Sequence, residues 1–173
     1  MKIMLDCSPK KTQYSRAGVP YGLDNGCFKR FKQKTWEKML DEAREHQPKF
    51  VCMPDIVCDA VRTFDLFDAF EKKTEGLPRA LVLQDGIGQH RINWEKLDAV
   101  FVGGSDNFKI SQEAFNTCRT AKMLGKWVHV GRVNTAPRVK NWLGLADSID
   151  GSGISKYDHM LENVLEAIHG TST

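Results

Sequence analysis

The chain has 173 residues, of which 41% are hydrophobic and 27% are charged, with four Trp and nine Phe. This length and composition predict one globular domain over residues 1–173 with a core that needs no disulfide, and they exclude a disordered chain. A formal net charge of +3 is too small to diagnose a nucleic-acid partner by itself.

Short apolar, β-prone runs predict seven strands, separated by polar stretches with helical periodicity. The runs lie at residues 2–7, 21–26, 50–57, 79–86, 99–104, 127–133 and 147–153. Apolar residues recur at helical spacing in residues 35–47, 61–76, 93–97, 111–126, 136–146 and 157–169. Thr35, Ser111 and Pro137 are helix-start signals, and Gly76 and Gly125 are helix stops.

Strands that alternate with helices predict an α/β fold with parallel strands, either a closed barrel or an open doubly wound sheet. Polar, acidic or glycine residues follow nearly every strand: Asp24, Asp55, Gln84, Gly103, Gly104, Gly131 and Asp150. A barrel gathers all its strand ends around one site, whereas an open sheet gathers only those near its switch point. Because the chain is short and has seven predicted strands, we expect a compact, incomplete or distorted (β/α) TIM-type barrel.

Three of these strand ends carry side chains that suit chemistry or recognition. Asp24 is followed by Asn25 and Gly26, a pair that turns the chain sharply, so Asp24 is either a site residue or a turn cap. Asp55 is costly to bury unless it is hydrogen-bonded or used, and helix capping is its alternative role. The Gln84 amide can donate to and accept from the edge of a base, or it can make a structural bond at the edge of the core.

The later strands add further candidates. Gly103 and Gly104 allow close approach of the backbone to a flat ligand, although a tight turn explains them nearly as well. Asp147 and Asp150 are three residues apart and would face opposite sides of an extended strand, which favours Asp150 at the strand end. His129 either lines the pocket or is a core histidine with satisfied hydrogen bonds.

Taken in order, the segments LDNGCF, MPDIVCD, VLQDG, FVGG, HVGRV and DSIDG resemble the tRNA-guanine transglycosylase family and its DNA-acting 7-deazaguanine relatives. The resemblance covers residues 21–153. It implies that Asp24 is the general acid/base and that Asp150, or alternatively Asp147, is the nucleophile that takes the sugar carbon. The base-binding residues that we expect on this basis are Asp55, Gln84, Gly103, Gly104, Asn25 and His129.

The chain also departs from the family pattern. Asn25 and Cys27 replace a Ser and a Gly of the family's first motif, and the Pro-Thr-Arg that follows the nucleophile is missing. No Cys-rich zinc motif occurs, and the family's zinc-bearing extension is absent. We therefore expect no metal and no cofactor, and DNA is favoured over tRNA as the substrate.

These features predict an enzyme that cleaves the N-glycosidic bond of a nucleobase, with one carboxylate at the anomeric carbon and a second group that protonates the departing base. We expect a DNA glycosylase that excises a modified base, a plausible defence against phage with hypermodified genomes. The alternatives are a base-exchange transglycosylase on DNA or tRNA, a deoxyribosyltransferase on free nucleosides, and an inactive barrel that only binds nucleic acid.

A base within a duplex cannot reach a barrel mouth, so the expected partner is DNA that is single-stranded or has a flipped base. Taken alone, the basic cluster after Asp24 is typical of a solvated face, but in this context we expect it to bind phosphates. The predicted backbone contacts are Lys10, Lys11, Arg16, Lys29, Arg30, Lys32, Lys34, Arg132 and Arg138, with Tyr14 or Phe28 stacking on a base. A homodimer is compatible with the sequence.

The cysteines and the N-terminus bear on the compartment. Five cysteines are an odd number and form no C-x-x-C pair, and the segment MKIMLDCSPKK has no cleavable apolar run. No apolar run approaches the roughly 20 residues that span a bilayer. We expect a cytoplasmic protein with no membrane role.

Overall fold

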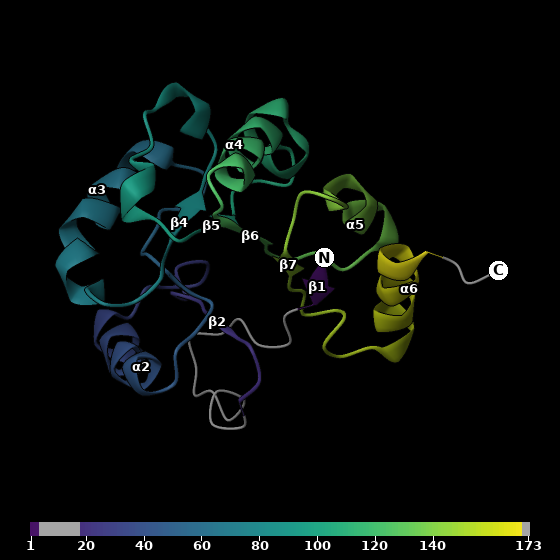
Figure 1. Cartoon of the computed structure of the whole chain (residues 1–173), viewed down its shortest axis with the longest axis horizontal. Coiled ribbons are helices and arrows are strands. Elements are labelled where there is room, and N and C mark those ends of the chain that lie inside the picture. Colours follow the sequence, from purple (N-terminus) through teal and green to yellow (C-terminus); the bar gives the residue numbers. More distant parts are fainter. Residues whose placement is uncertain (4–17, 171–173) are drawn as a thin grey trace.

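The computed structural model of the chain describes residues 1–3 and 18–170 and has a mixed α/β fold built on parallel strands (Figure 1). The strands are β1 (Lys2–Ile3), β2 (Gly22–Leu23), β3 (Phe50–Cys52), β4 (Arg79–Leu83), β5 (Ala99–Val102), β6 (Trp127–Val130) and β7 (Ser148–Ile149). All seven predicted strands are confirmed, and β2 to β7 are each shorter than the predicted segment. The predicted contacts Lys10, Lys11, Arg16 and Tyr14 lie outside the described residues.

The strand order is β1-β7-β6-β5-β4-β3-β2, and every pair is parallel. Successive strands from β2 to β7 are therefore neighbours, and β1 joins the far edge beside β7, as in a β/α barrel. Among the described residues no pairing joins β1 to β2, so the sheet is open at this seam. The fold is compatible with a partial β/α barrel but is not a closed TIM barrel.

Helices cover the outer side of the strands in sequence order, from α2 to α6 (Figure 1). They are α2 (Gln33–Glu45), α3 (Ala60–Phe70), α4 (Gln112–Met123), α5 (Ala136–Trp142) and α6 (Asp158–His169). Short 3-10 turns lie at η1 (Glu71–Thr74), η2 (Ile87–Gln89), η3 (Trp94–Lys96) and η4 (Phe108–Ile110). None of the described helices is long and apolar enough to cross a membrane.

The predicted helix starts at Ser111 and residue 136 are confirmed, but two predicted ends are wrong. The helix α3 ends at Phe70 and is followed by η1, so Gly76 is not its stop, and α5 ends at Trp142 and not at residue 146. The Ser111 side chain accepts a hydrogen bond from the Ala114 N–H at 3.1 Å, and Pro137 lies in the first turn of α5. Thr35 is not the start of α2, which begins two residues earlier at Gln33 without a side-chain cap. The predicted helix at 93–97 is only the 3-10 turn η3.

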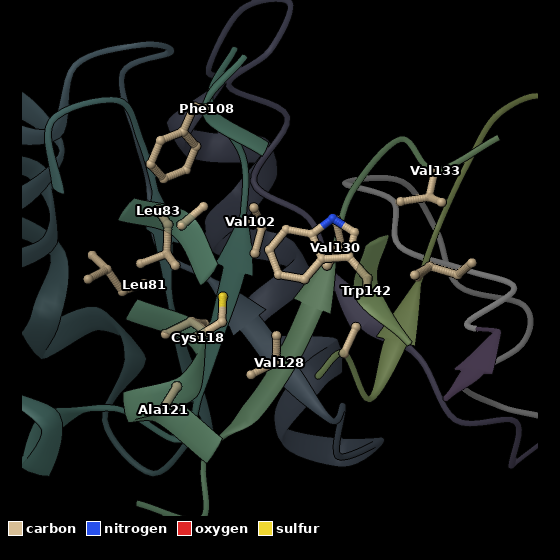
Figure 2. Close-up of a cluster of buried hydrophobic side chains, with 14 of the residues drawn as sticks. Leu81, Leu83, Val102, Phe108, Cys118, Ala121, Val128, Val130, Val133 and Trp142 are labelled. Carbon is tan, nitrogen blue, oxygen red and sulfur yellow. The ribbon is translucent and has the colours of Figure 1, made fainter. Parts of the chain in front are cut away.

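Alternate residues of the central strands pack into two different apolar clusters, because side chains alternate across a sheet. The outward-facing residues Leu81, Leu83, Val100, Val102, Val128 and Val130 share a cluster with helix residues. Figure 2 labels five of them, all except Val100, in the same cluster as Cys118 of α4 and Trp142 of α5. The inner cluster contains Phe50, Cys52, Ala80, Val82 and Ala99, with Phe101 and Trp127 packed against it. The side chains on both faces of the sheet are buried in these clusters. A site that is open to solvent is therefore expected at the ends of the strands.

Candidate active site

A cavity of about 600 Å³ opens at the carboxyl ends of the strands. Residues that follow six successive strands line it: Asp24, Asn25, Asp55, Gln84, Gly103, Gly104, Gly131, Arg132 and Asp150. The parallel strands all end on the same side, which brings together residues that are up to 126 positions apart in the chain. The structure thus gathers Asp24, Asp55, Gln84 and Asp150, the strand-end side chains singled out in the sequence, around one space.

A hydrogen-bonded chain beneath the cavity holds Asp150. The His129 ring is fully buried and contacts both Phe50 and Phe101, whose ring centroids lie 5.1 and 4.8 Å from its own. Its Nε2 lies 2.9 Å from Asp150 Oδ2, and its Nδ1 lies 2.8 Å from Ser148 Oγ. Because an ionised carboxylate can only accept, His129 donates from Nε2. The sequence left open whether His129 belongs to the core or the pocket; it is a core residue that orients a pocket carboxylate.

The surroundings of Asp150 favour its ionised form. Burial alone would raise the pKa of this carboxyl, but the bond from His129, the Arg132 N–H at 2.9 Å from Oδ1 and the positive charge of Lys109 hold the pKa below its ordinary value. Asp150 is therefore charged at neutral pH, and its side chain keeps 22% of its surface exposed. A charged, fixed and partly exposed carboxylate can face a developing positive charge.

Asp24 has the opposite electrostatic character. Burial, with a smaller contribution from repulsion by Asp150, raises the pKa of Asp24 from 3.8 to about 6, against the opposing hydrogen bond from the Gly26 N–H at 3.3 Å. At pH 7 about a tenth of the molecules carry the proton. Two carboxyl groups on one cavity whose pKa values are moved apart form an acid and base pair.

Asp55 is the centre of a buried polar network. Its Oδ1 accepts from Asn25 Nδ2 at 2.7 Å, and its Oδ2 accepts from Gln84 Nε2 at 2.6 Å. Gln84 Oε1 accepts from the Cys58 N–H at 2.8 Å, so the structural role considered for Gln84 is realised. Burial raises the pKa of Asp55 in spite of these bonds. Asn25 and Gln84 thus fix the carboxylate of Asp55 at the cavity wall.

Unusual backbone conformations flank the same cavity. Among the described residues, Cys58 (φ 62°) and Arg132 (φ 60°) are the non-glycine residues with positive φ. Each donates its backbone N–H to a cavity side chain, Cys58 to Gln84 and Arg132 to Asp150. A left-handed backbone at a residue with a Cβ costs about 1 kcal/mol or more and is concentrated at functional sites. The strain here orients two polar groups of the cavity.

Bare backbone and apolar side chains form the floor. A Cβ at Gly103 would lie 2.8 Å from Val82 Cγ1, and one at Gly131 would lie 2.6 Å from the Phe101 ring. Only glycine fits at these two strand ends without displacing the floor. Val82 and Phe101 themselves line the cavity. This part of the cavity is therefore apolar and carries no side chain at Gly103 or Gly131, as is typical of sites that bind an apolar ring.

The predicted phosphate contacts divide into three groups. Lys29 and Arg132 line the cavity, and the Arg132 guanidinium lies 4.4 Å from the centre of the Phe28 ring, which is 63% exposed. Arg30, Lys32 and Lys34 are exposed but do not line it. Arg138 is held by Asp106 at 2.8 Å, which reduces its availability for a phosphate.

Asp147 does not reach the cavity. Its Oδ1 lies 2.6 Å from Lys122 Nζ, and its Oδ2 accepts from the Val128 N–H at 2.8 Å. These contacts hold it at the start of β7, at the opposite end from Asp150. The structure therefore removes Asp147 as the alternative nucleophile.

Two cations of the cavity, Lys109 and Lys156, were missed in the sequence. Lys109 lies between the apolar Phe108 and Ile110 in η4, a placement that could have flagged a buried lysine. No group of three His, Cys, Asp or Glu residues that could hold a metal ion occurs in the described part of the chain.

No protein-family model matches the chain, and no curated protein matches it. The chemistry of the cavity is therefore the basis for assigning a function.

Proposed function

We propose that this chain is an enzyme that cleaves the N-glycosidic bond of a nucleobase in DNA, a glycosylase for a modified base built on an incomplete (β/α) barrel. One observation carries the proposal: Asp24 and Asp150 line a single cavity, with the pKa of Asp24 raised to about 6 and that of Asp150 lowered. Cleavage of this bond needs one charged carboxylate and one proton donor.

The two carboxyl groups have distinct roles in this mechanism. As the base departs, positive charge develops on the sugar, and the Asp150 carboxylate stabilises the anomeric carbon or bonds to it. Water then adds to the anomeric carbon, which frees Asp150 and leaves an abasic sugar in the strand. Asp24 in its protonated form gives its proton to the departing base. His129 is a positioning residue, since its bond fixes Oδ2 of Asp150 and leaves the remaining lone pairs for the sugar.

Base recognition is assigned to the Asp55 network. The Asp55 carboxylate accepts one amide N–H on each oxygen and a further hydrogen bond from the Cys27 side chain. A carboxylate has about four lone-pair sites, so one is left for a base edge that presents an N–H donor. The apolar floor of Val82, Phe101 and the glycine backbone is suited to contact with a planar ring. A cavity of about 600 Å³ is large enough for one extruded nucleotide.

The test is incubation of the protein with duplex and single-stranded DNA carrying natural or modified bases. We expect mass spectrometry to detect a released base, and alkali to cut the strand at the abasic site. If a supplied free base enters the strand instead, the enzyme is a base-exchange transglycosylase. If no base is released or exchanged from any DNA or nucleoside, the proposal is wrong.

Reversal of three charges near the cavity mouth tests the nucleic-acid substrate. The triple change Lys29→Glu, Arg30→Glu and Lys32→Glu is expected to weaken activity on oligonucleotides about tenfold or more and to flatten its salt dependence, because phosphate contacts release counterions. Kinetics at two salt concentrations measure this effect. The matched control reverses three lysines away from the strand ends that form the cavity: Lys49 and Lys126, which directly precede β3 and β6, and Lys72 of η1. If both triple variants keep the parent's activity on free nucleosides, and neither changes the activity on DNA, a nucleoside enzyme is favoured.

A further inference from the structure

Lys109 is a buried amine on the wall of the cavity that the mechanism above does not use. It lies in η4, directly after β5, and is 5% exposed. Its Nζ donates one hydrogen bond, to the Gly131 carbonyl oxygen at 2.5 Å. Across the described residues no carboxylate lies within ion-pair distance of this nitrogen. An unpaired buried cation is costly, and at a cavity wall it points to a functional group.

The surroundings of Lys109 favour a neutral, nucleophilic amine. Burial and the neighbouring Arg132 cation lower the pKa of Lys109 from 10.5 to about 8, although Asp150 acts in the opposite direction. At pH 8 about half of the molecules therefore carry the free amine. A desolvated lysine close to another cation is a known way to activate an amine for attack on carbonyl carbon.

The amine and the Asp150 carboxylate flank the same two-residue turn. The Gly131 carbonyl accepts from Lys109, and the adjoining Arg132 N–H donates to Asp150. Both side chains line the cavity, and their charges interact. A sugar whose anomeric carbon faces Asp150 therefore lies within the same small space as the Lys109 nitrogen.

We propose that Lys109 gives the protein a second activity, cleavage of the DNA strand at an abasic deoxyribose through a Schiff base. The inference rests on the proposed function, because it takes the product of base release as its substrate. The substrate class is a 2-deoxyribose aldehyde within a DNA strand.

The steps balance without an oxidant or a cofactor. The free amine adds to the C1′ aldehyde of the ring-opened sugar and expels water, which gives an imine that takes up a proton. The imine acidifies the C2′ hydrogen, and the ionised Asp150 is available to accept this proton. The electron pair forms a C2′–C3′ double bond and the 3′ phosphate leaves. Water then hydrolyses the imine, which returns the amine and releases an unsaturated aldehyde.

The experiment uses duplex DNA with one preformed abasic site, so that it does not depend on base release by this protein. With sodium borohydride present, we expect a covalent protein–DNA adduct, and peptide mass spectrometry should map it to Lys109. Without borohydride, we expect a strand break at the abasic site. An adduct mapped to Lys29, Lys156 or the N-terminal amine, or no adduct at all, would overturn the proposal.

Variants separate a nucleophile from a structural cation. Lys109→Arg keeps the charge and should lower the trapped adduct about a hundredfold or more, while base release from modified DNA falls much less. Lys122→Arg is the matched control, because Lys122 pairs with Asp147 outside the cavity. This variant should give as much trapped protein–DNA adduct as the parent protein. If the protein releases base but forms no adduct, the proposed lyase activity is wrong and the proposed glycosylase stands. If it forms an adduct on the preformed abasic site but releases no base from any DNA, the proposed glycosylase is wrong and the lyase stands.

Discussion

Asp150→Asn is expected to lower the rate of base release about a hundredfold or more while the protein stays folded. The asparagine has no negative charge to place against the anomeric carbon, and this charge matters most in the transition state. Single-turnover kinetics with enzyme in excess over modified DNA measure the step directly. Far-UV circular dichroism and urea unfolding show that the fold persists.

The hydrogen bonds around position 150 explain why the variant should fold. An asparagine oxygen can still accept from the Arg132 N–H, which now contacts Oδ1. The amide nitrogen then faces His129 Nε2, which accepts if the ring proton moves to Nδ1 beside Ser148 Oγ. Ser148 Oγ, which already accepts from Trp127 Nε1 at 2.9 Å, then also accepts from Nδ1, and its own proton loses this acceptor. We expect this one buried hydroxyl to cost about 1–3 kcal/mol of stability, which still leaves the variant folded.

Asp147→Asn is the matched control for this variant. It changes an aspartate of the same segment, but one that faces Lys122 and the Val128 N–H outside the cavity. We expect it to release base at a rate close to that of the parent protein. Near-normal activity in Asp150→Asn, or an equal loss in both variants, would remove Asp150 from the mechanism.

The sequence was sufficient to predict the strands and the convergence of their ends, and the reason is topological. Parallel strands joined by helices end on one side of a sheet, so polar residues after each apolar run must meet there. Asp24, Asp55 and Asp150 meet for this reason, although they belong to different parts of the chain. Their chemical roles were implied by a family resemblance, and the opposite pKa changes of Asp24 and Asp150 are the support for proposing the catalytic pair.

The properties that depend on register and burial could not be predicted in the same way. His129 pairs with Ser148 across β6 and β7, and this register points both side chains and Asp150 into the barrel interior. Nothing in the segment WVHVG indicates which strand lies beside it. Lys109 was missed because a single lysine in a loop is normally solvated, and only the packing around η4 buries it.

Asp24→Asn is the second variant with a large expected effect, on both activity and pH dependence. Loss of the proton donor should lower base release about a hundredfold or more. In the parent protein the rate should fall about tenfold for each pH unit above 6, because Asp24, with a pKa of about 6, must hold its proton. The variant should lose this fall, which a single-turnover pH profile between pH 5 and about 8 can measure.

The same variant should be more stable than the parent at alkaline pH, because of the sign of the pKa change. Folding raises the pKa of Asp24 from 3.8 to about 6, so its contribution to stability is present below pH 3.8 and is lost as the pH rises through 6. The full loss is up to about 3 kcal/mol, since one pKa unit is about 1.4 kcal/mol.

Asparagine does not ionise, so urea unfolding should show similar stabilities for Asp24→Asn and the parent near pH 4 and a more stable variant near pH 8. If the buried carboxyl of Asp24 lowers stability at pH 8 but is needed for catalysis, Asp24→Asn should lower activity and raise stability at the same time. A variant that keeps the parent's rate and pH profile would show that Asp24 is a turn cap and not the proton donor. A variant that loses activity without gaining stability at pH 8 would show that the carboxyl is solvated, and another group must then protonate the base.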